Sequence, residues 1–171
     1  MRILFIGDIV GEPGRRAVQQ LVPKIKKRSD IEFVIANGEN IAGGSGLTPA
    51  LAEDLYSYGV DCITTGDHVW KRKEIMERLD SDRRILRAAN YPEGAPGSGS
   101  TIVESGSGTA VGVINLIGRV FMQPLECPFR AARKEIDRIK SKARVIIVDM
   151  HAEATSEKVA MGWFLDGQVS C

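Results

Sequence analysis

Four short, continuously apolar segments, each followed by polar residues, constrain the fold most. An apolar run without alternation is typical of a strand that is covered on both faces, and such strands favour a mostly parallel sheet. Segments with helical character lie between the first runs, and Thr48-Pro49 offers a cap and a first helical residue for one of them. The alternation predicts an α/β fold. The apolar runs are residues 3–6, 31–36, 60–65 and 144–149, and the helical segments are 13–27, the residues after Pro49, and 71–79.

The second half of the chain has a different pattern of predicted elements. Residues 101–104 and 109–117 read as two strands of a hairpin that is joined by a Ser-Gly-Ser-Gly turn. Residues 129–141 form a charged amphipathic pattern that predicts a helix, and Thr155 is expected to cap a last helix ending near Phe164. With 171 residues the chain can bury a sizeable core, so we expect one domain over residues 1–171.

Charge and cysteine content exclude several classes of protein. Lys and Arg total 23 against 22 Asp and Glu, a formal net charge of +1, so a surface for long nucleic acids or membranes built on bulk charge is not expected. The three cysteines, Cys62, Cys127 and Cys171, lack the spacing of a disulfide framework or a metal-binding pair. No signal peptide or membrane-spanning run is evident, which predicts a cytoplasmic location.

Polar side chains follow each apolar run. Because the carboxyl ends of parallel strands meet at one edge of a sheet, these side chains are expected to converge there. Carboxylate and amide oxygens mixed with imidazole suit Mn, Fe, Zn or Mg, and a bridging carboxylate is a common basis for a two-metal hydrolase site. The residues concerned are Asp8, Glu39, Asn40, Asp67, His68, Asp149 and His151.

Each of these residues has a simpler explanation when taken alone. Asp8 taken alone is better explained as a helix cap or a loop acid, and a single histidine more often bonds a backbone carbonyl than a metal. Both histidines of the chain, however, fall within two residues of strand ends that carry acids, which favours the metal hypothesis. Arg119 could offer a guanidinium to a phosphate, although arginines near turns are commonly only solvated.

A dinucleotide site is a further alternative. Glycines 7, 11 and 14 follow the first run with spacing G-x-x-x-G-x-x-G, which departs from the G-x-G-x-x-G of Rossmann folds. An acid, Asp8, also lies inside that turn, where it would repel a pyrophosphate. Glu39 could still serve as the ribose-binding acid, so a Rossmann-type oxidoreductase remains as a third hypothesis.

Six motifs, in this order, resemble those of the YmdB-like metallophosphoesterases, a branch of the calcineurin-like superfamily of two-metal phosphoesterases. The resemblance implies an αββα sandwich in which Asp8, Glu39, Asn40, Asp67 and His151 bind metal, Glu39 bridges the ions and His68 donates a proton. The motifs are residues 2–11 with Pro13-Gly14-Arg15, residues 37–40, residues 66–68 with Trp70, residues 89–94, Asn115-Leu116 with Gly118-Arg119, and residues 149–158.

The resemblance also implies an activity. Two divalent ions, Mn or Fe with Zn or Mg as alternatives, would support hydrolysis of 2',3'-cyclic nucleotides or similar phosphodiesters by a metal-bound hydroxide, in a homo-oligomer. The sequence departs from the family at Asp67, where Asn is common. A Gly-x-His-x-His motif that the family places just after position 171 is not in this sequence, so we expect a C-terminally truncated sandwich. The alternative is a non-catalytic nucleotide- or metal-binding module that acts through partners.

Overall fold

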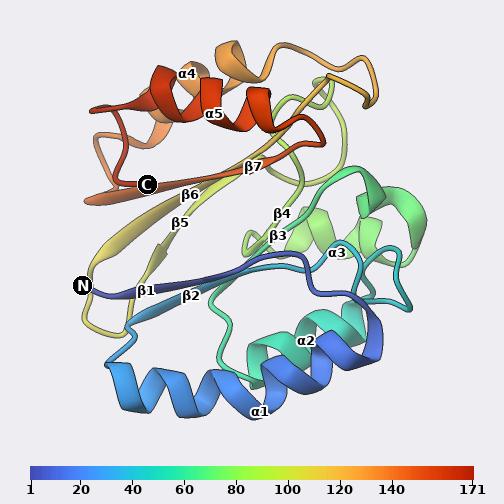
Figure 1. Cartoon of the computed structure of the whole chain (residues 1–171), viewed down its shortest axis with the longest axis vertical. Coiled ribbons are helices and arrows are strands. Elements are labelled where there is room, and N and C mark those ends of the chain that lie inside the picture. The colour runs from blue at the N-terminus through green and yellow to red at the C-terminus, as the bar shows by residue number, and fades with distance from the viewer.

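The computed structural model describes all 171 residues as two β-sheets packed face to face, with helices on both outer faces (Figure 1). The first sheet has the order β1-β2-β3-β4 and is parallel throughout. The second has the order β5-β6-β7, in which β5 and β6 are antiparallel and β6 and β7 are parallel. The strands are β1 (Ile3–Ile6), β2 (Phe33–Asn37), β3 (Cys62–Thr64), β4 (Ile85–Leu86), β5 (Ser100–Glu104), β6 (Ala110–Ile117) and β7 (Val145–His151).

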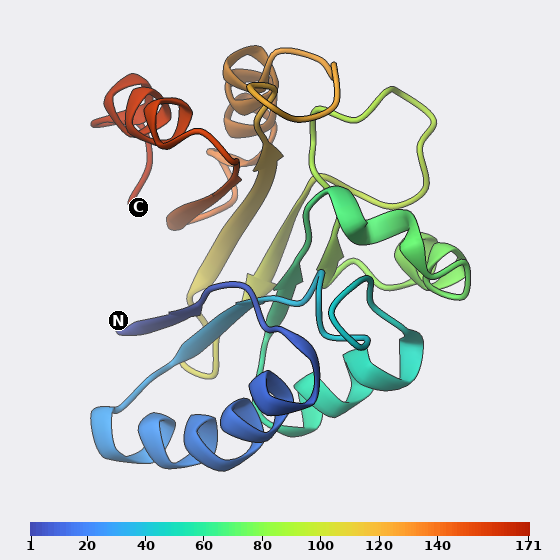
Figure 2. The same cartoon turned by 45° about the vertical axis from the view of Figure 1, so that its right-hand side comes forward.

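The helices complete a four-layer αββα arrangement. Helices α1 (Gly11–Ser29) and α2 (Pro49–Ser57) cover the outer face of the first sheet, and α4 (Pro128–Ile139) and α5 (Thr155–Leu165) cover that of the second (Figures 1 and 2). The 3-10 helix η1 (Asp67–Lys71) and the short α3 (Ile75–Ser81) follow β3. None of the helices is both long and apolar enough to cross a lipid bilayer.

Strand β2 explains why the apolar runs are continuous. Its residues are all buried, with Phe33 and Ile35 in the cluster between the two sheets and Val34 and Ala36 in the cluster beneath α1 and α2. Full burial of a side chain of this size contributes about 1.5–3 kcal/mol. Both faces of the strand therefore contribute to folding, and a polar residue is tolerated only where the strand ends, at Asn37.

The predicted fold class and the order of elements are confirmed, and three local details are wrong. The helix expected at 71–79 is interrupted because Arg72 is extended and its guanidinium donates to the carbonyls of Ala42 and Ser45. Thr155 is the first residue of α5 rather than its cap, since Ala154 occupies the N-cap position without a side-chain bond. Strand β4 was not predicted because two residues are too short to give a periodic pattern.

Candidate metal centre

The ends of four strands supply the predicted site residues. Asp8 follows β1, Glu39 and Asn40 follow β2, Asp67 and His68 begin η1 after β3, and His151 is the last residue of β7. The sequence pattern placed these ends on the edge of one parallel sheet. Strand β7 instead belongs to the second sheet, because it pairs with β6. The site therefore forms where the two sheets meet.

Glu39, Asp67 and His151 form the centre of the cluster. Their potential ligand atoms all lie within 4.8 Å of one another. His151 Nε2 is 3.3 Å from Glu39 Oε1 and 3.4 Å from Asp67 Oδ1. Glu39 is only 2% exposed, and this burial raises the pKa of its carboxyl group, with partial compensation from His151. A cation in the cluster would offset the cost of keeping this buried acid ionised.

Asn40 connects the other predicted residues to this centre. Its Nδ2 donates to Asp8 Oδ2 at 2.8 Å and to Glu39 Oε1 at 3.1 Å. Its Oδ1 lies 2.6 Å from His68 Nδ1. Because an amide oxygen only accepts, the bond places a proton on Nδ1 of His68. The backbone N–H of His68 donates to Glu39 Oε2 at 3.3 Å, so the network returns to the central acid.

Gly66, between β3 and η1, leaves the space that a bound ion needs. A Cβ at this position would lie 2.5 Å from His151 Nε2 and in contact with Glu39 Oε2. Two carboxylates and an imidazole, with an amide and a third carboxylate alongside, are a suitable donor set for a divalent transition metal. The residues present therefore fit the metal site that the resemblance implies.

Asp149 does not join this cluster, although the strand-end pattern included it. Residues 145, 147, 149 and 151 share the face of β7 that looks toward the first sheet, as the inter-sheet packing of Val145 and Ile147 indicates. Asp149 Oδ2 accepts from Thr64 Oγ1 at 2.5 Å and from Asn37 Nδ2 at 3.5 Å. Asn37 Oδ1 in turn accepts from the N–H of Glu39 at 3.2 Å. Asp149 therefore holds the backbone that carries Glu39.

Arg119 follows the segment that bonds to the end of β7, and it makes no contact with the candidate metal ligands. The preceding Gly118 donates its N–H to the carbonyl of His151 at 2.8 Å, and the N–H of Arg119 donates to the carboxylate of Glu157 at 3.0 Å. No ion pair or hydrogen bond engages the Arg119 guanidinium, so it is free to meet a ligand.

Sequence reasoning missed the supporting roles of Asn37, Thr64 and Gly66. The available signal was weak: Asn37 and Thr64 are the polar last residues of otherwise apolar strands, and Gly66 precedes an acid that was already a candidate ligand. Their importance depends on Asp149 and His151, which are distant in sequence and reach them only through the packing of the two sheets.

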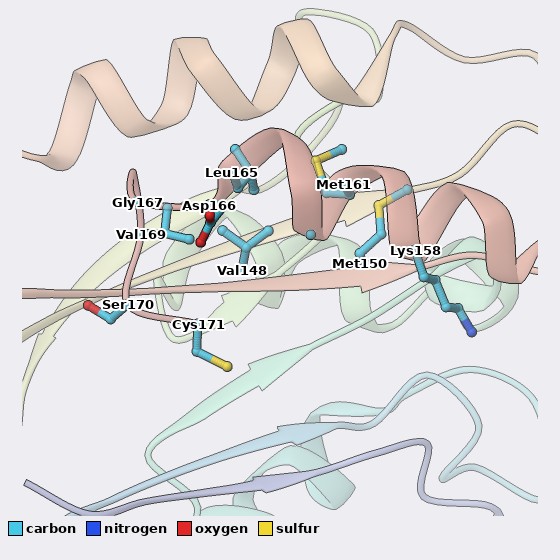
Figure 3. Close-up of a pocket in the computed structure, with 11 residues that line it drawn as sticks. Val148, Met150, Lys158, Met161, Leu165, Asp166, Gly167, Val169, Ser170 and Cys171 are labelled. Atoms are coloured by element: carbon cyan, nitrogen blue, oxygen red, sulfur yellow. The ribbon is translucent and has the colours of Figure 1, made fainter.

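A separate cavity of about 340 Å³ lies between α5 and β7 (Figure 3). Val148, Met150, Met161 and Leu165 line it, and Lys158 adds the one cation. None of the candidate metal ligands contributes to this cavity. It is mainly an apolar space under α5 and is no part of the candidate metal centre.

The chain is similar to several known proteins. A 2',3'-cyclic-nucleotide 2'-phosphodiesterase of Bacillus subtilis is 48% identical over 170 residues, which are 99% of this chain and 64% of that protein. A crystal structure of a hypothetical protein from Thermus thermophilus superimposes with a TM-score of 0.91 at 44% identity, covering 99% of this chain and 65% of the other. A crystal structure described as a novel phosphatase, from Mycoplasma pneumoniae, gives a TM-score of 0.88 at 31% identity, covering 98% and 60%.

The chain thus spans less than two thirds of the length of these relatives. The family model for YmdB-like proteins matches residues 4–171, which include every residue of the candidate metal centre. The chain belongs to the YmdB-like protein family.

Proposed function

We propose that this chain carries the centre of a metal-dependent phosphodiesterase that acts on 2',3'-cyclic nucleotides or similar phosphodiesters. The observation that carries the proposal is the convergence of Glu39, Asp67 and His151 within 4.8 Å, joined to Asp8 and His68 through Asn40. The name of the Bacillus subtilis relative, which is 48% identical, supports this choice of substrate class.

Asp8, Glu39, Asn40, Asp67 and His151 would hold two divalent ions, for which we propose Mn or Fe. Glu39 is suited to a bridging position because Oε1 faces both Asn40 and His151. The bound ions would activate a water molecule and neutralise charge on the phosphoryl oxygens. Asp67 adds a carboxylate beside His151, which strengthens attraction for cations.

His68 is placed to donate the proton that the departing ribose oxygen needs. Its ring is 34% exposed, so a substrate can reach it. Asn40 fixes the Nδ1 side of the ring and leaves Nε2 directed toward the Asp67 carboxylate, 3.8 Å away.

Arg119 is our candidate for binding the substrate rather than the metal. The carboxylate of Glu157 holds the backbone N–H of Arg119, while the Arg119 side chain has no partner. Such a guanidinium is available to bind a phosphate. We expect Arg119→Ala to raise KM for 2',3'-cyclic AMP with a smaller effect on kcat. Self-association and a cytoplasmic location, expected from the resemblance and the sequence, stay predictions.

The decisive experiment is hydrolysis of 2',3'-cyclic AMP by the purified chain with and without added Mn, compared with Glu39→Gln. We expect Mn-dependent hydrolysis that falls at least about 100-fold in the variant, because the central ligand loses its charge. Glu153→Gln, an exposed acid two residues after His151, is the matched control and is expected to keep its activity. Undiminished hydrolysis in Glu39→Gln contradicts the proposal.

The non-catalytic alternative makes a different prediction in the same assay. A module that binds nucleotides or metal and acts through partners would bind the cyclic nucleotide without hydrolysing it and without dependence on Mn. A Rossmann-type oxidoreductase would instead bind a nicotinamide or flavin cofactor.

A further inference from the structure

A second, strongly polar cavity lies between α4 and the segment of residues 87–99. Its volume is about 680 Å³, which falls within the range of sites for small molecules. No residue of the candidate metal centre lines it. Tyr91 in the lining packs its ring edge to face on Trp70 of η1, with centroids 5.2 Å apart. The charged residues lining the cavity are Arg87, Arg130, Lys134 and Arg138, with Glu93, Glu126 and Glu135.

Three of the cations form a row on α4. Arg130, Lys134 and Arg138 are spaced four residues apart, so they lie on one side of the helix and all reach the cavity. The guanidinium of Arg138 already has two partners: it forms an ion pair with Glu135 at 2.7 Å and donates a hydrogen bond to Ser100 Oγ. Arg130 and Lys134 have no such partner and are exposed. Two free cations therefore line the cavity on the α4 side.

The opposite wall holds Arg87, whose guanidinium is only partly hydrogen-bonded. Nε of Arg87 is buried without a hydrogen-bond partner, although Nη1 of the same side chain donates to the carbonyl of Ala88 at 2.8 Å. Nη2 of Arg87 makes no hydrogen bond and is not among the buried atoms, so it can donate to a ligand rich in acceptor oxygens.

Local packing keeps this wall in place. Gly99 lies so close to Ala89 that a Cβ at position 99 would collide with that residue. The N–H of Arg87 donates to the carbonyl of Ser98 at 3.1 Å, and the N–H of Gly97 donates to Asp80 at 2.7 Å. The wall that carries Arg87 is therefore fixed on both sides before any ligand arrives.

We propose that this cavity binds the phosphate group of a small phosphorylated ligand through Arg87, Arg130 and Lys134. A phosphate offers several acceptor oxygens and negative charge, which match a guanidinium with an unused donor and two free cations. Glu93 and Glu126, the acids in the lining without a described cation partner, favour a compact anion over an extended polyanion. The site is independent of the proposed catalytic function, because none of its residues belongs to the candidate metal centre.

The test is isothermal titration of the full chain with inorganic phosphate, and in a second arm with adenosine 5'-monophosphate. A chelator keeps the metal centre free of ions, so its three carboxylates repel phosphate there. The test variant is Arg130→Ala/Lys134→Ala, and the matched control is Lys140→Ala/Lys142→Ala. The control removes the same charge from exposed positions that lie outside this cavity. Thermal melting verifies that all three proteins are folded.

We expect the wild-type chain to bind inorganic phosphate, the test variant to bind it at least tenfold more weakly, and the control to stay within about twofold of wild type. Tighter binding of the nucleotide, in competition with phosphate, identifies a nucleotide as the ligand. Equal or weaker binding of the nucleotide identifies free phosphate as the ligand. Absence of phosphate binding by the wild type, or equal weakening in test and control variants, overturns the proposal.

Discussion

The carboxylate of Asp149 lies 2.5 Å from the hydroxyl of Thr64 and thereby fastens β7 of the second sheet to β3 of the first. The same oxygen accepts from the side-chain amide of Asn37, and Oδ1 of that amide accepts from the N–H of Glu39. A side chain that the strand-end pattern grouped with the candidate ligands thus serves to position a residue that binds metal in our proposal.

Replacing Asp149 tests this positioning role. Asp149→Ala leaves the Thr64 hydroxyl and the Asn37 amide without a partner, so we expect the free energy of unfolding to fall by about 2 kcal/mol. We also expect Mn affinity to weaken roughly tenfold, as for other residues that orient metal ligands. Asp149→Asn can keep both contacts and is the control. Urea denaturation and Mn titration measure the two effects, and equal losses in both variants contradict this role.

Gly66→Ala is expected to damage the metal centre without unfolding the chain. The backbone at Gly66 has a φ of −132°, outside the left-handed region that favours glycine. Its Cβ would nevertheless collide with Glu39 and His151. We expect at least a tenfold loss of Mn affinity with a smaller change in melting temperature. Gly7→Ala, at a site where a Cβ meets no atom within 4 Å, is the control. Mn affinity at the wild-type level in Gly66→Ala would refute this account.

Metal content is a direct check of the proposed two-metal site. After reconstitution with Mn, elemental analysis is expected to give close to two ions per chain for the wild type, as in two-metal hydrolases. Glu39→Gln is expected to retain fewer ions, since Glu39 contacts both halves of the cluster. A wild-type content well below one ion per chain would contradict a two-metal centre on the residues of this chain.

Asp82 gives a prediction of pH dependence away from the metal centre. Burial by itself raises the pKa of Asp82, but bonds from the Arg84 N–H and the Tyr56 hydroxyl, with the charges of Arg84 and Arg78, lower it overall. An acid with a lowered pKa stabilises the folded state above its ordinary pKa of 3.8, and this contribution is lost as the pH falls through the folded value.

We therefore expect Asp82→Asn to lower the free energy of unfolding at pH 7 by about 2 kcal/mol, because bonds to a charged acceptor become bonds to a neutral one. The difference from wild type should shrink as the pH is taken below 3.8. Chemical denaturation at pH 7, 4 and 3 measures the trend. A difference that is constant over this range rules out the ionised Asp82 carboxylate as the source.

Local chemistry explains how much of this structure the sequence predicts. The buried strand β2 is recognisable because both of its faces pack against other layers, and Thr48 caps α2 as its position before Pro49 indicates. The break at Arg72 is not recognisable, because the carbonyls that hold its guanidinium belong to a loop about 30 residues earlier. The direction of Asp149 likewise depends on which sheet β7 joins, and long-range pairing decides that.

The division of the candidate ligands between two sheets has a thermodynamic consequence. Glu39 and Asp67 follow strands of the first sheet and His151 ends a strand of the second, so an ion held by all three would cross-link the two halves of the sandwich. Ion binding and the packing of the two sheets are then thermodynamically linked. An ion that stabilises the packed sheets binds more tightly when other contacts also stabilise that packing. Buried residues such as Val113 and Phe33, which touch no ligand, thereby become determinants of metal affinity.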